Sequence, residues 1–206
     1  ECFKHVLKEF GYQPKDDRTI YNTIGMTLVD AFDLLTDMPD NPQREDMRKA
    51  YVKKADEVMV KKTYFYDDTI ALLQTLQNAG VKVGIVSTKY RYRIVNTFNE
   101  QAGSLPVDII VGGEDVTKAK PDPQGLDLIV ERFGADKSDV LYIGDSYIDA
   151  ETARNAGVDF LAITTGTTSA ETFARYPHIA ILPAIAALKD ELADELRGMT
   201  ILYGRY

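Results

Sequence analysis

Short apolar runs alternate with amphipathic runs from about residue 69 onward, and this alternation constrains the fold more than any other feature of the chain. The apolar runs resemble strands buried in a parallel sheet, and they cover 81–87, 107–111, 140–143, 160–163 and 179–182. The runs between them predict helices over or near 69–79, 94–98, 123–133, 149–156, 169–175 and 185–196. This order predicts an α/β fold with a Rossmann-like, doubly wound parallel sheet.

The first third of the chain has helical signals and no convincing strand. Phe3, Val6, Leu7 and Phe10 recur at helical spacing before Gly11. Further helical faces fall within 31–35 and 47–58, and Asn41 before Pro42 is a reasonable helix start. We therefore predict a small helical module over 12–66, with 1–11 and 67–206 forming the α/β core. Such a module is either a lid over an active site or a purely structural bundle.

Composition excludes several classes of protein. The net charge is −8, which argues against non-specific binding to nucleic acid or to an anionic membrane. The single cysteine, Cys2, excludes an intrachain disulfide and a multi-cysteine zinc site. No apolar run is long enough to span a bilayer and no signal peptide is visible, so we expect a cytoplasmic protein. Composition leaves the oligomeric state open.

Two carboxylates follow the apolar run 140–143. Gly144 ends this run, Asp145 lies at the expected strand tip, and Asp149 opens the next helical run. In open α/β sheets ligands bind beyond the carboxyl ends of the strands, so both acids are expected where a ligand would lie. Hard carboxylate oxygens at such a site suit Mg²⁺. The alternative is structural, with Asp145 capping the helix and Asp149 serving as favourable first-turn charge.

A second strand end carries hydroxyl groups. Ser87 follows the run VKVGIV and is followed by Thr88 and Lys89. A hydroxyl next to exposed backbone amides can hold phosphate oxygens. A plain Ser/Thr turn after a strand is the alternative.

The loop GGEDVTKAKPDP carries a lysine in a restricted position. Lys120 directly precedes Pro121, which favours extended backbone at the lysine, and Pro123 suits the first turn of the following helix. A lysine held in this way can neutralise a phosphate or a carboxylate as a point charge. The alternative is an ordinary solvated loop lysine.

Together these segments resemble the haloacid dehalogenase superfamily. IVSTK, KAKPDP and GDSYIDA match its second, third and fourth motifs in order and at suitable spacing. The resemblance is closest to the phosphoglycolate phosphatase-like branch. It covers nearly the whole chain, because the helical module resembles the cap that this family inserts after its first strand.

The resemblance implies a role for each matching residue. Asp145 would be a direct ligand of Mg²⁺, and Asp149 would hold a metal-bound water or orient the site. Ser87 and Lys120 would be catalytic, the first by binding the transferring phosphoryl group and the second by stabilising negative charge. Thr88 would bind substrate through its backbone amide, although the family commonly has asparagine at this position.

The resemblance also implies further substrate contacts. Apart from the resemblance, Lys89 is close in sequence to the proposed phosphate position and could offset the negative charge of the chain there. The turn Gly25-Met26-Thr27 resembles the substrate-facing loop of the cap, so Gly25 and Thr27 are candidate substrate-binding residues. Gly25 could equally be a plain turn between helices.

The implied function is a Mg²⁺-dependent phosphatase that hydrolyses small phosphate monoesters through an aspartyl-phosphate intermediate. Its partner would be a small phosphorylated metabolite, held under the helical cap. Two alternatives stay open. One is a sugar-phosphate mutase of the same superfamily, and the other is a non-catalytic protein that binds or senses a phosphorylated ligand.

The family's first motif, Asp-x-Asp-x-Thr, does not occur in the 206 residues. In the family it supplies the nucleophile, and its strand lies at the centre of the sheet, between the strands that end at Ser87 and Asp145. Without that strand two inner sheet edges would be unpaired, which is costly for buried backbone groups. We therefore expect roughly 20 residues, one strand and part of a helix, to precede Glu1.

Overall fold

The structure is a computed structural model that describes residues 1–188 and 200–204. Its contacts divide the chain into two compact units, a helical unit over Glu1–Thr63 and an α/β unit over Tyr64–Tyr206. Each unit has its own hydrophobic core.

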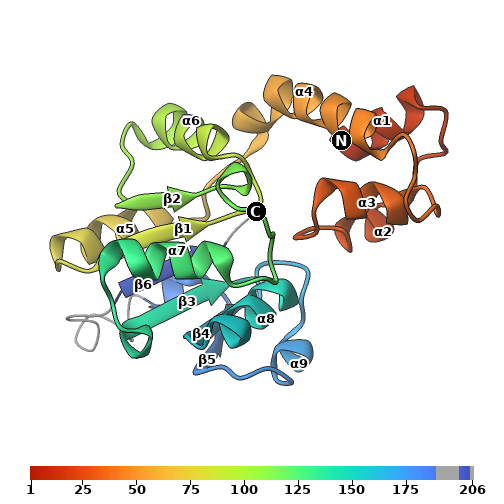
Figure 1. Ribbon diagram of the computed structural model, residues 1–206. Helices are drawn as coiled ribbons and strands as arrows, with labels where there is room; N and C mark the ends of the chain where they lie inside the picture. The colour runs from red at the N-terminus through yellow and green to blue at the C-terminus, as the bar shows by residue number, and fades with distance from the viewer. Residues whose placement is uncertain (189–199, 205–206) are drawn as a thin grey trace. The chain divides into compact units, whose positions relative to one another are not determined.

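The helical unit consists of α1 (Cys2–Glu9), α2 (Asp17–Tyr21), α3 (Leu28–Leu35) and α4 (Arg44–Lys62) (Figure 1). Its core contains Val6 and Leu7 of α1, with Phe32 of α3 and Tyr51 of α4. The Phe3 ring lies 5.3 Å from that of Phe32 and 4.7 Å from that of Tyr51, so one aromatic cluster joins three helices. The helical face predicted for residues 3–10 is thus buried inside this unit.

The division between the units differs from the predicted boundaries. Residues 1–11, predicted to be part of the α/β core, belong to the helical unit, because α1 buries its apolar face against α3 and α4. The start of α4 also differs from the prediction at Asn41, since the helix begins at Arg44. The Asn41 side chain instead folds back on the chain, where its Oδ1 accepts a hydrogen bond from the Gln43 backbone N–H at 2.8 Å.

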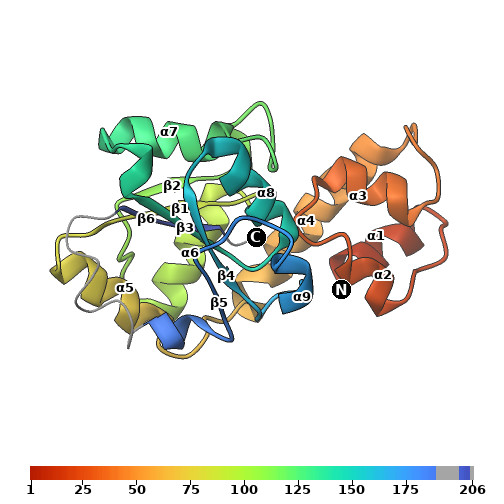
Figure 2. The ribbon, with the colours of Figure 1, turned by 90° about the horizontal axis from the view of Figure 1, so that it is seen from below.

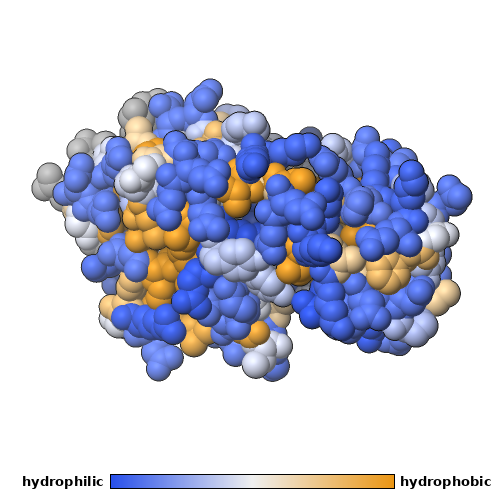
Figure 3. Space-filling model, turned by 90° about the horizontal axis from the view of Figure 1, so that it is seen from above, coloured by the Kyte–Doolittle hydropathy of each residue, from blue (hydrophilic) through white to orange (hydrophobic). Residues whose placement is uncertain are grey.

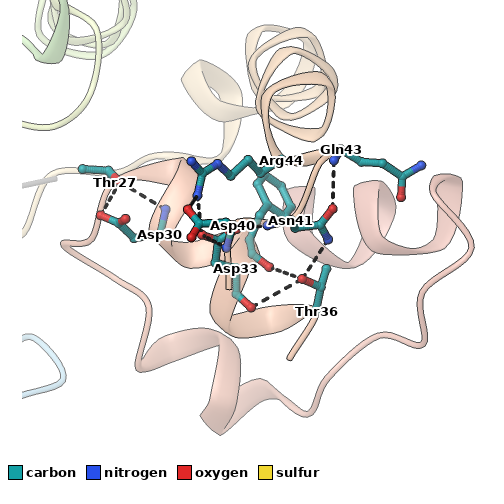
Figure 4. Close-up of polar contacts among 9 residues, drawn as sticks. Thr27, Asp30, Asp33, Thr36, Asp40, Asn41, Gln43 and Arg44 are labelled. Atoms are coloured by element: carbon teal, nitrogen blue, oxygen red, sulfur yellow. Dashed lines mark hydrogen bonds and ion pairs between the residues drawn. The ribbon is translucent and has the colours of Figure 1, made fainter. Parts of the chain in front are cut away.

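A buried polar network holds the turn between α3 and α4 (Figure 4). Asn41 is 1% exposed, and its Nδ2 donates to Tyr12 Oη and Thr36 Oγ1, both at 3.0 Å. Asp33 accepts hydrogen bonds from the backbone N–H groups of Asp40 and Asn41 at 3.1 Å and from the Arg44 guanidinium at 2.8 Å. These bonds satisfy groups that the turn would otherwise bury without partners.

The Asp33 carboxylate makes the stability of the helical unit depend on pH. Burial raises its pKa, but hydrogen bonds from Arg44 and from the Asn41 and Asp40 amides outweigh this effect and hold the pKa below the ordinary value of 3.8. Because the folded-state pKa is lowered, its contribution to stability is complete above pH 3.8 and is lost as the pH falls through the folded-state pKa.

We therefore expect the difference in melting temperature between wild type and Asp33→Asn to be largest near neutral pH and to shrink below about pH 4. Thermal unfolding followed by circular dichroism between pH 3 and 7 measures this difference. Asp46→Asn, at an exposed position of α4, is the control and should show little difference at any pH. A wild-type advantage that persists unchanged at pH 3 would contradict the assignment.

The α/β unit is built on one parallel six-stranded sheet with the order β2-β1-β6-β3-β4-β5. Its strands are β1 (Lys82–Val86), β2 (Ile109–Val111), β3 (Val140–Gly144), β4 (Asp159–Ile163), β5 (Ala180–Leu182) and β6 (Thr200–Gly204). The first five were predicted as strands, and the predicted doubly wound α/β class is confirmed. β6 was not predicted.

The centre of the sheet differs from the expectation, which gave this position to a strand preceding Glu1. β6 lies there, between β1 and β3, and pairs with both in register from Thr200 to Gly204. The physical reason is the one that made an open position costly, since both inner edges need partners for their backbone hydrogen bonds. Ile201 of this strand is 2% exposed, as expected for a strand at the centre of a parallel sheet.

Helices cover both faces of the sheet (Figure 2). α5 (Thr69–Asn78) and α6 (Arg91–Ala102) pack on one face, with the 3₁₀ turn Ile185–Ala187. α7 (Gln124–Phe133), α8 (Tyr147–Ala156) and α9 (Ala170–Phe173) pack on the other. The alternation of side chains along β3 sends Leu141 and Ile143 to the first core and Val140 and Tyr142 to the second.

The helices predicted in this unit are present, with one partial exception. Of the helix predicted over 185–196, the structure describes only the beginning, and 189–199 lie outside the described residues. Two further 3₁₀ turns cover Gly113–Asp115 and Lys137–Asp139. In the view of Figure 3 the surface is mostly hydrophilic, with smaller apolar patches. Among the helices that the structure describes, none is long and apolar enough to cross a membrane.

Candidate active site at the carboxyl edge of the sheet

The sheet register brings Ser87 and Asp145 to the same edge. Val86, the last residue of β1, and Gly144, the last residue of β3, are both paired with Gly204 of the intervening strand. Ser87 and Asp145 each follow one of these residues, so their backbones lie roughly 10 Å apart, which is two spacings between parallel strands. Both side chains are buried, with Ser87 4% and Asp145 1% exposed.

Asp149 is the centre of a fully buried hydrogen-bond network. Its Oδ1 accepts from Lys120 Nζ at 2.6 Å and from Tyr142 Oη at 2.8 Å. Its Oδ2 accepts from the Ser146 hydroxyl at 2.6 Å and from the Ser146 backbone N–H at 3.2 Å. Asp149 is 0% exposed and Lys120 is 8% exposed. Lys120 and Asp149, which the motifs predict to share a site with Asp145, thus form a direct ion pair.

The start of α8 explains how Asp149 reaches this position. Ser146, and not Asp145, caps the helix, because its hydroxyl accepts from the Asp149 backbone N–H while the Asp149 side chain bonds back to Ser146. Gly144 lets the helix approach the strand closely, since a Cβ at this position would lie 2.3 Å from the Asp149 Cβ. The structural alternative considered for Asp145, a helix cap, is therefore not what the residue does here.

Asp145 is packed between the end of β3 and the loop after β4. A Cβ on Gly166 would lie 2.3 Å from the Asp145 backbone oxygen and 2.9 Å from its Cγ, so the loop backbone touches the aspartate directly. The Asp145 side chain is buried, with its Oδ1 atom shielded from solvent. The Tyr147 N–H donates to Thr168 Oγ1 at 3.1 Å and ties the same loop to α8.

Ser87 opens a tight turn after β1. Its backbone N–H donates to the Val111 carbonyl, and its Oγ accepts from the Lys89 N–H at 3.1 Å. The Gly113 N–H donates to the Lys89 carbonyl at 3.0 Å, and a Cβ on Gly113 would lie 2.6 Å from the Thr88 carbonyl oxygen. The turn predicted as the alternative for Ser87 is present, and it places the hydroxyl and the Thr88 and Lys89 backbone at the edge where Asp145 lies.

Two side chains that the sequence did not single out hold the Lys120 loop. Gln124, the first residue of α7, accepts hydrogen bonds through Oε1 from the Thr117 and Lys118 backbone N–H groups at 2.9 and 2.8 Å. Asn155 of α8 donates through Nδ2 to the Pro121 carbonyl at 2.8 Å. The Lys120 loop is thus held from α7 and from α8, and Lys120 itself is buried, so the alternative of a solvated loop lysine is wrong.

The remaining predicted residues lie in the helical unit. Gly25 has a positive φ of 95° in the turn before α3. Thr27 caps α3, because its Oγ1 accepts from the Asp30 N–H at 3.2 Å and donates to Asp30 Oδ2 at 2.6 Å (Figure 4). The Thr27 side chain therefore has a structural role in this unit, and substrate binding by Gly25 and Thr27 stays a prediction.

The site offers few potential metal ligands, but they are carboxylate oxygens, which suit a hard cation. Among residues 1–188 and 200–204 there is no group of three or more His, Cys, Asp or Glu side chains that could hold a metal ion. Asp149 accepts four hydrogen bonds, which fill the acceptor sites of a carboxylate, and this suits an orienting residue better than a direct ligand. Asp145 brings an oxygen donor of the kind that Mg²⁺ prefers to the strand tip.

Fold and site together define a class of protein. A doubly wound parallel sheet carries a serine turn, a buried lysine and two aspartates at its carboxyl edge, and a separate helical unit precedes it. The chain matches the family model of the haloacid dehalogenase-like hydrolases over residues 1–163, and it belongs to this family.

Its relatives place it in the phosphoglycolate phosphatase-like branch. It is 27% identical to the pyrophosphatase PpaX of Oceanobacillus iheyensis over 161 residues, which are 78% of this chain and 73% of that protein. It is 28% identical to the phosphoglycolate phosphatase of Shigella boydii over 148 residues, 72% of this chain. The matched region spans only 57% of the length of that phosphatase.

A solved structure agrees with membership of the family. A haloacid dehalogenase-like hydrolase from Bacteroides fragilis is 44% identical and superposes with a TM-score of 0.87, covering 91% of this chain and 89% of that chain. Membership of this family assigns the protein to the haloacid dehalogenase-like hydrolases.

Proposed function

We propose that this protein is a Mg²⁺-dependent phosphatase of small phosphate monoesters. The observation that carries the proposal is the buried Lys120–Asp149 pair, held beside Asp145 at the sheet edge that also bears the Ser87 turn. Such an edge combines a fixed positive charge, backbone amides and a hydroxyl, which are the groups that bind a transferring phosphoryl group. The family membership supports the same reaction class.

Each residue then has a defined task. The Ser87 hydroxyl and the Thr88 amide bind the oxygens of the phosphoryl group, with Lys89 close to them. Lys120 offsets the negative charge that develops during transfer, and Asp149 fixes its position. In the family the transfer passes through an aspartyl-phosphate on the nucleophile of the Asp-x-Asp-x-Thr motif. That motif does not occur in the 206 residues, and here β6 lies where the family has the motif's strand.

Asp145 is the residue that we propose as the direct ligand of Mg²⁺, and Asp149 supports the metal's surroundings through Lys120 and Ser146. When bound, the cation shields the negative charge that nucleophile and phosphate bring together. Small phosphorylated metabolites are the proposed substrates, with the helical unit as a cap and Gly25 and Thr27 as contacts in it. The single cysteine suits a reducing compartment, so we place the activity in the cytoplasm.

Turnover of p-nitrophenyl phosphate with and without Mg²⁺ tests the chemistry. A panel with 2-phosphoglycolate and pyrophosphate then tests the substrates that the names of the relatives suggest. The natural protein, isolated from the organism that makes it, is assayed in parallel with the 206-residue chain, and its N-terminus is sequenced. Calorimetric titration with inorganic phosphate gives a readout that does not need a nucleophile. If both samples lack turnover and phosphate binding, the proposal is refuted.

The change Asp145→Asn keeps the size of the side chain and removes its charge. Metal binding contributes several kcal/mol to reactions of this type, so we expect kcat/KM to fall at least about 100-fold. The rise in melting temperature that Mg²⁺ causes in the wild type should be absent in the variant, because a ligand stabilises only the state that binds it. Asp122→Asn, in the loop before α7, is the control. An unchanged response to Mg²⁺ would refute the metal role.

A second candidate is favoured by one observation, the absence of the first motif from the sequence. A protein without the nucleophile would bind a phosphorylated ligand and release it unchanged, as a sensor does. Phosphate binding without turnover in the natural protein would support this function. Phosphoryl migration within a sugar phosphate, detected by ³¹P NMR without release of phosphate, would instead support a mutase.

A further inference from the structure

Tyr142 carries the one polar side-chain atom that β3 places in the core beneath α7 and α8. The residue is 0% exposed, and its neighbours in this core include Leu126, Ile129 and Ala153. Its ring lies 6.2 Å from that of Phe160. Phenylalanine would fill this space equally well and would avoid the cost of burying a hydroxyl. The hydroxyl therefore needs a partner, and it has one in Asp149 Oδ1 at 2.8 Å.

The same oxygen of Asp149 also accepts from Lys120 at 2.6 Å. The two donors have different origins, since Tyr142 lies in the middle of a paired strand and Lys120 lies in a loop. A lysine side chain has four rotatable bonds and loses much rotamer entropy when it is fixed. The tyrosine, by contrast, is held by the sheet and by the aromatic packing around it.

The location of Asp149 is thus determined from two sides. Ser146 holds Oδ2 through its hydroxyl and its N–H, and Tyr142 holds Oδ1 from the sheet. Without the Tyr142 hydroxyl, the carboxylate could turn about its Cβ–Cγ bond, and the Lys120 ammonium would move with it. A misplacement of about 1 Å in a charged group can cost about 100-fold in rate.

We propose that Tyr142 is a positioning residue, whose buried hydroxyl locks the Asp149 carboxylate and thereby fixes Lys120 for phosphoryl transfer. This role rests on the proposed phosphatase function. It deepens that function by adding a residue from the hydrophobic core to the machinery. Tyr142 contacts neither substrate nor metal in this assignment, and it acts only through Asp149 and Lys120.

The change Tyr142→Phe removes only the hydroxyl. We expect kcat for p-nitrophenyl phosphate to fall about 10-fold or more, as for loss of a hydrogen bond to a charged group, with KM within about twofold of wild type. Tyr176→Phe is the matched control, because its hydroxyl bonds to Glu151 at 3.5 Å outside this network. Its kcat should equal that of wild type. Equal kcat values for the two variants would overturn the proposal.

A double-mutant cycle separates positioning from a general structural effect. Inorganic phosphate affinity is measured by calorimetry for wild type, Tyr142→Phe, Lys120→Met and the double variant. If Tyr142 acts through Lys120, its change weakens phosphate binding in the wild type but adds no loss to Lys120→Met. An equal loss in both backgrounds would overturn the proposal. This readout does not depend on turnover.

Rescue provides a second variant. 4-Aminophenylalanine at position 142 keeps a donor near the site of the hydroxyl, and we expect it to regain most of the lost kcat. This variant also decides the question if Tyr142→Phe does not fold, since a folded variant with wild-type kcat supports the role and one with a 10-fold deficit overturns it. Failure of the proposed function would be seen in the wild type itself, as absent turnover and absent phosphate binding.

Discussion

Replacing Lys120 by methionine is expected to lower the free energy of unfolding by about 3–5 kcal/mol, because it leaves the Asp149 carboxylate buried without its counter-charge. The two side chains are 5% and 0% exposed, and 2.6 Å separates Lys120 Nζ from Asp149 Oδ1. Turnover and phosphate affinity should fall with it, since the positive charge of the site is lost. Urea denaturation followed by circular dichroism measures the stability change.

Two further variants separate the ion pair from other effects. Lys118→Met removes a lysine two residues away whose side chain is 73% exposed, so its stability should change by less than about 1 kcal/mol. The double variant Lys120→Met/Asp149→Asn removes both charges and should regain much of the lost stability, because no uncompensated charge stays buried. A Lys120→Met protein as stable as Lys118→Met would show that the pair is not buried in solution.

The change Gly144→Ala is expected to destabilise the protein by about 3 kcal/mol, at the upper end of the usual cost of overpacking. The added Cβ would lie 2.3 Å from the Asp149 Cβ and 2.8 Å from its Cγ. Strand and helix would have to separate, which would pull Asp149 away from Tyr142 and Lys120. Phosphate affinity should therefore fall together with stability, as measured by calorimetry and urea denaturation.

Gly157→Ala, at the other end of α8, is the matched control. No atom lies within 4 Å of the Cβ that it would add, but its φ is 71°, so we expect a cost of about 1 kcal/mol from backbone strain alone. Its phosphate affinity should match that of wild type. Equal effects of the two alanines on both measurements would contradict a close approach of α8 to β3.

The elements of the α/β unit could be predicted because their residues follow simple periodic rules. The run 140–143 reads as a buried strand and is one, and Gly157 marks the end of α8 as expected. The start of α4 could not be predicted in this way, because Asn41 hydrogen-bonds to Gln43, Tyr12 and Thr36 instead of starting the helix. Propensity describes isolated segments, whereas side-chain partners from elsewhere decide such boundaries.

The polar residues of the site differ in how far the sequence identifies them. Ser87 and Asp145 follow strand ends and Asp149 lies in the helix after the second of these strands, so the pattern predicts that they share a sheet edge. Lys120 joins them through the resemblance of KAKPDP to a motif of the family. The Tyr142 hydroxyl carries no such signal, because tyrosine in an apolar strand is an ordinary core residue. Gln124 and Asn155 likewise resemble common helix residues. Their roles depend on which backbone groups the fold brings within reach.

Local patterns predict the class of the fold and place Ser87, Asp145 and Asp149 at one sheet edge, because strand ends and hydrophobic periodicity are local properties of the chain. Three features emerge only from contacts in the folded chain: Asp149 is saturated with hydrogen bonds, α1 belongs to the helical unit, and β6 lies at the centre of the sheet. These features depend on contacts between segments far apart in the chain, where burial and unsatisfied hydrogen bonds set the energy.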